Sequence, residues 1–292
     1  MAVGAVRDIR NGQLVLHVRP GWLLLSAALV LATYFLLIWA WLYIIKGLSG
    51  RRIRYLHGAR IWFISNFVGQ FVPGKVWGIL QMGAMSVEAG INPVASGAAS
   101  IINTVVNIAT GMAVGVVTGA PILIAYAGSR AHWAWIAAAL AVVGVIALPL
   151  LVPFLFRFAR RLGARVPEQY LPPRLIAVSA AANVVAWGMY GMAFLCLNRG
   201  LITLPSYDPI QHIAVNATSY VVGYMALIAP GGLGFREATL EQMMLAAQMA
   251  SPAQAQAVSV VSRLWQIIII VLPALIFLAY RRPSNEKDAA AG

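Results

Sequence analysis

Five long apolar runs, each bounded by polar or basic residues, dominate the hydrophobic pattern of this chain. A helix needs about 20 residues to cross the apolar layer of a membrane, and all five runs reach that length. Asn92 precedes Pro93, and Ser251 precedes Pro252 with Gln254 following, and both sequences are typical of helix N-termini. The pattern predicts five membrane-spanning helices, over residues 21–45, 93–119, 133–156, 175–197 and 253–280.

Two further apolar regions are interrupted by proline and glycine. Residues 61–89 break at Pro73-Gly74, and residues 209–249 break at the sequence Pro-Gly-Gly-Leu-Gly of 230–234. Their short limbs suggest re-entrant hairpins, because broken backbone at membrane depth is tolerated only where protein or a watery cavity satisfies its polar groups. The alternative is two ordinary spans kinked at Pro-Gly, and the limb 209–229 is long enough to cross by itself.

Basic residues gather between the apolar runs. The formal net charge is +13, from 21 Lys and Arg against 8 Asp and Glu, and the segments 46–60 and 157–174 hold five basic residues each. Such clusters are typical of cytoplasmic loops. The resulting topology places residues 120–132 and 198–208 outside, the N-terminus outside and the C-terminus in the cytoplasm.

Under this topology the two interrupted regions enter the membrane from opposite faces. Each has an apolar limb, a Pro-Gly pair, a further glycine and a limb rich in Met and Gln. Corresponding interrupted segments of opposite orientation indicate an inverted-repeat transporter with its site near mid-membrane. We therefore expect an all-α integral membrane protein with five to six full transmembrane helices, one or two re-entrant helical hairpins and an inverted pseudo-repeat. Residues 1–282 would form a single domain, and residues 283–292 a short polar cytoplasmic tail.

The composition agrees with this class. Hydrophobic residues make up 61% of the chain and charged residues 10%, whereas charged residues make up about a quarter of a typical soluble domain. Disorder is excluded for the same reason. Nucleic-acid binding is disfavoured because no long hydrophilic surface is available. The single cysteine, Cys196, excludes an intramolecular disulfide.

Arg236 and Glu237 directly follow the second glycine-rich break. An arginine in the first turn of a helix opposes the helix dipole, and a charge at the bilayer centre costs roughly 2.5–3.5 kcal/mol. Glu237 points about 100° away around the helix, so it is a poor direct partner. An anion above the glycine turn would suit both Arg236 and free N–H groups at the helix start. The alternatives are an interfacial Arg–Glu pair and a structural partner on another helix.

Two more basic residues fall within membrane segments. Lys75 follows the first Pro-Gly break, where it is a second candidate head-group contact or a residue that extends to the interface. Arg263 lies in the last helix and is expected to face the protein interior. It would pair with Glu237 or Glu241, or contact the anion.

Small and amide residues share one predicted helix. Asn103 and Asn107 lie on one face, where they either hydrogen-bond to another helix or line a cavity. Gly111, Gly115 and Gly119 are four residues apart, a spacing that lets helices approach closely.

The run APGGLGFREA, residues 229–238, resembles the signature of the lysylphosphatidylglycerol synthase transmembrane family, which is flippase-like and includes stand-alone members. The run FVPGK, residues 71–75, resembles that family's first Pro-Gly element, and the order of elements matches from about residue 22 to 280. The resemblance implies movement of an anionic phospholipid or a polyprenyl-phosphate-linked lipid between leaflets of the bacterial inner membrane. Aminoacyl transfer is not expected, since no synthase domain follows residue 282.

The predicted partner is a membrane lipid with a phosphate head group, and no cofactor or metal is expected. Catalytic residues are not expected, because no nucleophile motif or metal-ligand spacing is found. An ion-coupled transporter of a small soluble anion, a lipid-modifying membrane enzyme and a non-catalytic partner of a glycosyltransferase or lipid-modifying enzyme remain alternatives. Homo-oligomerisation also remains open. The predicted substrate-binding residues are Pro73, Gly74, Lys75, Asn103, Asn107, Pro230, Gly231, Gly232, Gly234, Arg236, Glu237 and Arg263.

Overall fold

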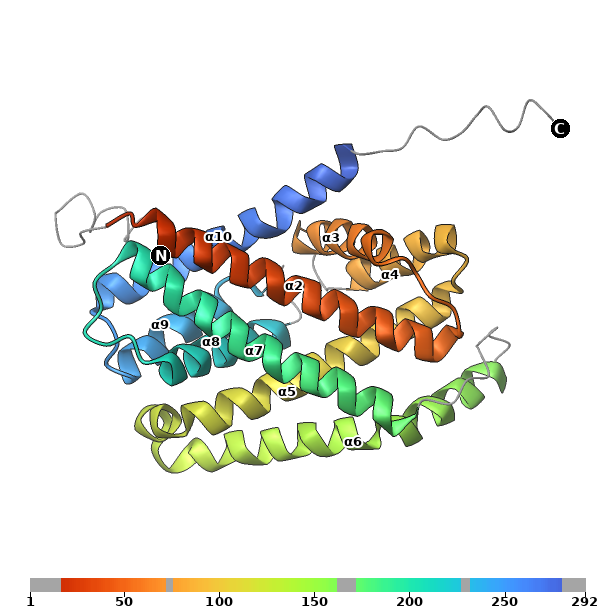
Figure 1. The fold of residues 1–292 in the computed structure, drawn as a ribbon. Coiled ribbons are helices and arrows are strands. Elements are labelled where there is room, and N and C mark those ends of the chain that lie inside the picture. The colour runs from red at the N-terminus through yellow and green to blue at the C-terminus, as the bar shows by residue number, and fades with distance from the viewer. Residues whose placement is uncertain (1–16, 72–75, 162–171, 227–231, 280–292) are drawn as a thin grey trace.

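Long helices form the body of the molecule (Figure 1). The computed structural model describes residues 17–71, 76–161, 172–226 and 232–279, and every regular element within these ranges is helical. Five helices contain apolar stretches long enough to cross a membrane, which confirms the predicted all-α membrane fold. They are α2 (Pro20–Ser49), α5 (Pro93–Ala127), α6 (Ala131–Arg161), α7 (Pro173–Leu201) and α10 (Pro252–Ala279).

Four shorter helices form two pairs. The first pair is α3 (Tyr55–Phe71) and α4 (Val76–Ser86), and the second is α8 (Pro209–Met225) and α9 (Phe235–Ala246). They have 17, 11, 17 and 12 residues, below the length of about 20 that a single crossing needs. The predicted breaks at Pro73-Gly74 and Pro230-Gly231 fall outside the described residues. Two short 3₁₀ turns, η1 (Val87–Ala89) and η2 (Gly128–Arg130), complete the described elements.

The helices α2 and α7 run antiparallel and define the two ends of the bundle. At one end the backbone N–H of Arg19 donates to the carbonyl of Gly200 at 2.9 Å, and a Cβ on Gly200 would lie 2.7 Å from Leu23. At the other end Gly47 of α2 contacts Leu175 at the start of α7. The end of α2 and the end of α7 therefore lie at opposite ends of the molecule.

The pair α3–α4 begins and finishes at the end of the bundle where α2 finishes. Arg51, in the link from α2 to α3, donates from Nη1 to the carbonyl of Gly90, directly after η1, at 2.8 Å. The two limbs lie against each other, since a Cβ on Gly69 would lie 3.7 Å from the Cα of Gly78. The chain thus leaves and returns on one side, as expected for the re-entrant hairpin rather than the kinked span.

The pair α8–α9 does the same at the opposite end. Gln254, in the first turn of α10, donates from Nε2 to the carbonyl of Thr203, in the link from α7 to α8, at 3.0 Å. Within the described residues the limb predicted over 209–229 is helical as far as Met225, and the chain returns at Gln254 to the end where this limb began. Two hairpins therefore enter from opposite ends, and the inverted repeat between the halves stays a prediction.

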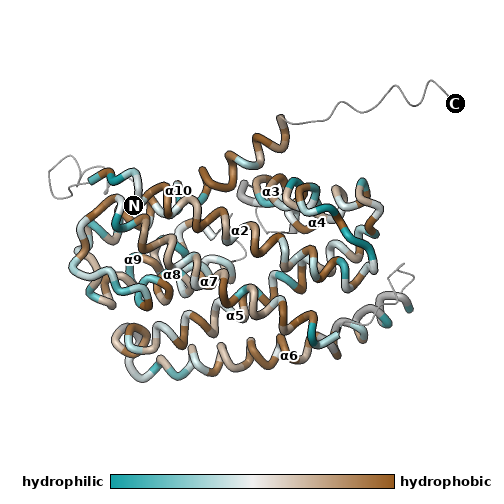
Figure 2. Tube along the Cα trace, in the orientation of Figure 1, coloured by the Kyte–Doolittle hydropathy of each residue, from teal (hydrophilic) through white to brown (hydrophobic). Residues whose placement is uncertain are grey.

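The links between helices are shorter than the basic segments suggested. Residues 46–60 were expected as a loop, but α2 continues through Ser49 and α3 begins at Tyr55. Nothing in these flanks breaks a helix before Gly50, which ends α2 with φ of 68°. The short link is hydrophilic against the apolar helices (Figure 2). Likewise most of the expected outer loop 120–132 is helical, because α5 reaches Ala127.

The predicted helix caps are confirmed. The side chain of Asn92 accepts from the backbone N–H of Val94 at 2.8 Å. Ser251 and Gln254 form a reciprocal capping box, with distances of 3.0 Å and 3.3 Å. These caps fix where α5 and α10 begin.

The glycine series on α5 packs against α7 and α8, as predicted. A Cβ on Gly111 would lie 2.5 Å from the Trp187 ring, and one on Gly115 would lie 2.8 Å from Thr218 Oγ1. A Cβ on Gly119 would lie 3.3 Å from Ala214 Cβ. Small residues therefore bring α5 close to the second hairpin.

Candidate functional site

A cavity of about 190 Å³ lies between the inner ends of the two hairpins. Gly69 and Gly78 line it from α3 and α4, and Gly223 and Arg236 line it from α8 and α9. Residues flanking both Pro-Gly breaks therefore meet at one space, although Pro73-Gly74, Lys75 and Pro230-Gly231 are themselves outside the described ranges. The remaining wall comes from α2, α5, α7 and α10, with Tyr34, Trp41, Asn103, Asn107, Trp187, Tyr190, Arg263 and Gln266 among its residues.

Arg236 is the most deeply buried charged residue of this wall. It is 2% exposed, and its guanidinium carbon lies 4.3 Å from the centroid of the Tyr220 ring. Its Nε, Nη1 and Nη2 are buried and have no hydrogen-bond partner among the described residues. Leaving buried charged donors unpaired is costly, and a cation–π contact does not satisfy N–H groups. This part of the chain therefore presents hydrogen-bond donors that suit an anion.

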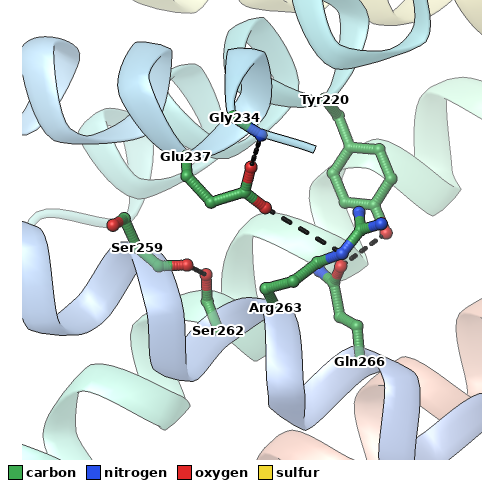
Figure 3. Close-up of polar contacts among 7 residues, drawn as sticks. All are labelled: Tyr220, Gly234, Glu237, Ser259, Ser262, Arg263 and Gln266. Atoms are coloured by element: carbon green, nitrogen blue, oxygen red, sulfur yellow. Dashed lines mark hydrogen bonds and ion pairs between the residues drawn. The ribbon is translucent and has the colours of Figure 1, made fainter. Parts of the chain in front are cut away.

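Glu237 has two partners in the described structure (Figure 3). Its Oε2 accepts from the backbone N–H of Gly234 at 2.7 Å, and its Oε1 lies 3.9 Å from Nε of Arg263 on α10. Of the partners considered for Arg263, the structure therefore shows Glu237. The expectation that the helix-start N–H groups are free is wrong for Gly234, because the helix's own carboxylate caps it.

The glycines after the second break allow the turn to pack onto α8. Gly232 has φ of 73°, and a Cβ there would collide with the carbonyl of Gly223. A Cβ on Gly223 would in turn lie 2.7 Å from the Cβ of Arg236. Gly234 also has a positive φ, 86°. These glycines bring the first turn of α9 against α8 and so set the position of Arg236 at the cavity.

A continuous aromatic belt crosses the cavity wall and ends at Arg236. We define this aromatic belt as Trp62, Tyr34, Tyr190 and Tyr220, whose successive ring centroids lie 5.2, 5.9 and 5.6 Å apart. All four rings line the cavity. They come from four helices, α3, α2, α7 and α8, so no local pattern in the sequence identified them.

Amide side chains add hydrogen-bonding capacity. Asn107 lines the cavity and also donates from Nδ2 to Oδ1 of Asn183 at 2.7 Å, so it serves both predicted roles. Asn103 lines the cavity, and its buried Oδ1 has no hydrogen-bond partner within the described ranges. Gln266 accepts from the hydroxyl of Tyr220 at 2.8 Å (Figure 3). Asn103 is thus an unpaired amide facing the same space as Arg236.

The charge of the described wall is positive. Arg236 and Arg263 line the cavity, and none of the described lining residues is Asp or Glu. Glu237 lies behind Arg263 and offsets its charge. The two arginines and this carboxylate sum to one positive charge, which matches a monoanion such as a phosphodiester.

Comparison with known protein families gives one finding. The family model described as the lysylphosphatidylglycerol synthase TM region matches residues 10–274, which contain both hairpins and four of the long helices in full. A search of curated proteins returns no match. The family match and the five long apolar helices make this a multi-pass membrane protein. The chain belongs to the lysylphosphatidylglycerol synthase transmembrane family.

Proposed function

We propose that this protein moves the head group of an anionic lipid between the leaflets of the bacterial inner membrane. The substrate is an anionic phospholipid or a lipid linked to polyprenyl phosphate, and no bond is made or broken. One observation carries the proposal: the guanidinium of Arg236, 2% exposed and without a hydrogen bond in the described structure, faces a cavity between two opposed hairpins.

Phosphate complements this guanidinium. A phosphate oxygen accepts charge-assisted hydrogen bonds, which are roughly twice as strong as neutral ones, and arginine can make two in parallel. The free protein carries the cost of burying Arg236, and the bound anion offsets that cost. The pair of Glu237 and Arg263 fixes α9 to α10 and leaves one net positive charge for the ligand.

The opposed hairpins provide a physical route. The hairpin α3–α4 reaches the cavity from one end of the bundle, and α8–α9 reaches it from the other. In our proposal the first hairpin enters from the cytoplasm, because the basic residues 51, 52 and 54 precede it. The N-terminus then lies outside. The head group passes from one hairpin to the other while the apolar tails stay in the bilayer.

The test is movement of fluorescent phosphatidylglycerol in vesicles reconstituted with the full chain. Arg236→Met keeps most of the side-chain volume and removes the charge. We expect the rate of lipid movement in vesicles with this variant to fall to the protein-free rate. Arg236→Lys should recover part of it, since lysine cannot make the bidentate contact. Arg199 is a matched control, because it also lies over aromatic rings, 5.0 Å from Trp22 and 4.9 Å from Tyr207, away from the cavity.

Thermal unfolding in detergent distinguishes a variant that has lost transport from one that has lost its fold. Arg236→Met should unfold at the same temperature as the parent chain or higher, because it removes a buried charge that has no hydrogen bond among the described residues. Normal lipid movement by Arg236→Met would overturn the proposal. Lipid movement lost together with stability would assign Arg236 a structural role instead. Uptake of inorganic phosphate without any lipid movement would favour a transporter of a soluble anion.

A further inference from the structure

The cavity contains an unpaired acceptor as well as unpaired donors. Asn103 makes no side-chain hydrogen bond among the described residues, and its Oδ1 is buried. Ser65 Oγ is also buried and without a partner there. A phosphodiester only accepts hydrogen bonds, so it suits Arg236 and the Ser65 hydroxyl but leaves the amide oxygen of Asn103 unsatisfied. A ligand that also donates hydrogen bonds would satisfy this oxygen.

An ammonium group is a poor candidate for that donor. Two arginines line the described wall, and no carboxylate does. Glu237 behind the wall offsets the charge of Arg263, so an ammonium would face one net positive charge, and like charges repel strongly in a cavity of low dielectric. A neutral hydroxyl donates to Asn103 without this cost and also accepts from the hydroxyl of Ser65.

The aromatic belt supplies the complementary apolar surface. Trp62 and Tyr34 lie 5.2 Å apart at one end, and Tyr190 and Tyr220 continue the surface to Arg236. The face of an aromatic ring carries negative potential and attracts the weakly positive C–H groups of a saturated ring. Amides and hydroxyls at the edge of such a surface bind the outward hydroxyls of that ring. Concave, mostly apolar walls with a few directed polar groups are typical of selective small-molecule sites.

We infer that the head group is a cyclic polyol, of sugar or cyclitol type, joined to the lipid phosphate. The phosphate binds Arg236, the ring lies on the aromatic belt, and hydroxyls bind Asn103 and Ser65. This inference rests on the proposed function and adds a substrate class to it. Lipids with a cationic head group are excluded by the same charges.

The test compares two lipids of equal charge and identical tails in vesicles containing the full chain. Fluorescent phosphatidylinositol carries a cyclic polyol, and fluorescent phosphatidylglycerol carries a short open one. We expect phosphatidylinositol to move about tenfold faster, the effect of one or two added hydrogen bonds and ring packing. Lysylphosphatidylglycerol, with its ammonium groups, should move more slowly than either.

Asn103→Ala tests whether the polyol hydroxyls bind at Asn103. It should reduce the rate ratio of phosphatidylinositol to phosphatidylglycerol several-fold. Asn216→Ala is the matched control, since Asn216 is a buried asparagine that does not line the cavity, and the ratio should be kept. Because the ratio is internal to each preparation, differences in the yield of folded protein cancel.

The outcomes separate the two proposals. Equal rates for the two anionic lipids, both abolished in Arg236→Met, would overturn the polyol inference and keep the proposed function. An unchanged ratio in Asn103→Ala would also overturn the inference, because the assigned hydroxyl contact would be absent. Failure of every lipid to move above the protein-free rate would instead contradict the proposed function itself.

Discussion

The two hairpins share an interrupted sequence but contribute differently to the cavity. The described wall residues of α3 and α4 are neutral, with Ser65, Asn66 and two glycines among them. The second hairpin contributes Arg236 and Tyr220. Its helix α9 is also held by an ionic contact to α10 through Glu237, whereas the described hydrogen bond of Asn66 stays within α3.

The two hairpins also differ in how many large apolar side chains their second helices bury. The helix α9 buries Leu240, Met243 and Met244, while α4 leaves Trp77 and Leu80 more than half exposed. A charged ligand-binding group is most effective on an element whose position is fixed by packing and by a second layer of contacts. The comparison shows that a Pro-Gly break marks the place of a site, and that the residues after it decide which hairpin holds the charge.

Glycine substitutions should give the largest difference in stability between the two hairpins. Gly232→Val places a β-branched residue at φ of 73° and drives its Cβ into the carbonyl of Gly223. Backbone strain of about 1–3 kcal/mol and overpacking of about 1–3 kcal/mol should add, so we expect severe loss of folded protein. Size-exclusion yield and thermal unfolding in detergent measure this.

Gly69→Ala in the first hairpin is the matched substitution. Its Cβ would meet Gly78 at 3.7 Å, an ordinary contact distance, so stability should change by less than about 1 kcal/mol. Equal melting temperatures for the two variants would refute the claim that Gly232 is packed more closely against Gly223 than Gly69 is against Gly78.

The ion pair should give the next largest difference. Glu237→Gln keeps an acceptor for the Gly234 N–H but leaves Arg263 without its carboxylate. Removing one partner of a buried pair costs about 3–5 kcal/mol, so the melting temperature should fall clearly. Asn66→Ala removes only a bond to Trp62 within α3 and should cost about 1 kcal/mol or less.

A double variant checks the cause. Adding Arg263→Gln to Glu237→Gln also removes the positive charge that Glu237 faced, so part of the stability should return. If the stability losses of the single variants Glu237→Gln and Arg263→Gln simply add in the double variant, the contact between Glu237 and Arg263 does not stabilise the hairpin. The contrast with α3–α4 is then lost.

Much of the fold could be predicted because the signals are local. Hydrophobic length identified the five long helices and placed their starts within two residues, and caps such as Asn92 set two of those starts. It missed the end of α5, which continues eight residues beyond the predicted end at 119. The start of α3 at Tyr55 was not predicted, since residues 55–60 directly follow Arg51, Arg52 and Arg54 and contain Gly58, which resembles a loop, but they contain no proline that would break a helix. Composition describes the side chains of a segment, and not its backbone.

Four of the predicted site residues line the cavity, namely Asn103, Asn107, Arg236 and Arg263. Arg236 stood out because its dipole and burial costs can both be seen in the sequence. The partner of Arg263 was left open between two glutamates, because contacts between α9 and α10 depend on how helices pack. The aromatic belt was not predicted, because its rings come from four separate helices and meet only in the folded chain.

The most direct test of a shared site between opposed hairpins is a reversible cross-link across the cavity. Ile79 of α4 and Tyr224 of α8 both line the cavity. The test variant combines Ile79→Cys and Tyr224→Cys with Cys196→Ser, which removes the native cysteine. A short bifunctional methanethiosulfonate should join the two cysteines within one molecule and thereby stop lipid movement in vesicles. Reduction of the cross-link should restore lipid movement. Each single-cysteine variant treated with the same reagent is the control. Absence of the intramolecular cross-link, or a complete cross-link with lipid movement unchanged, would contradict a head-group path between the two hairpins.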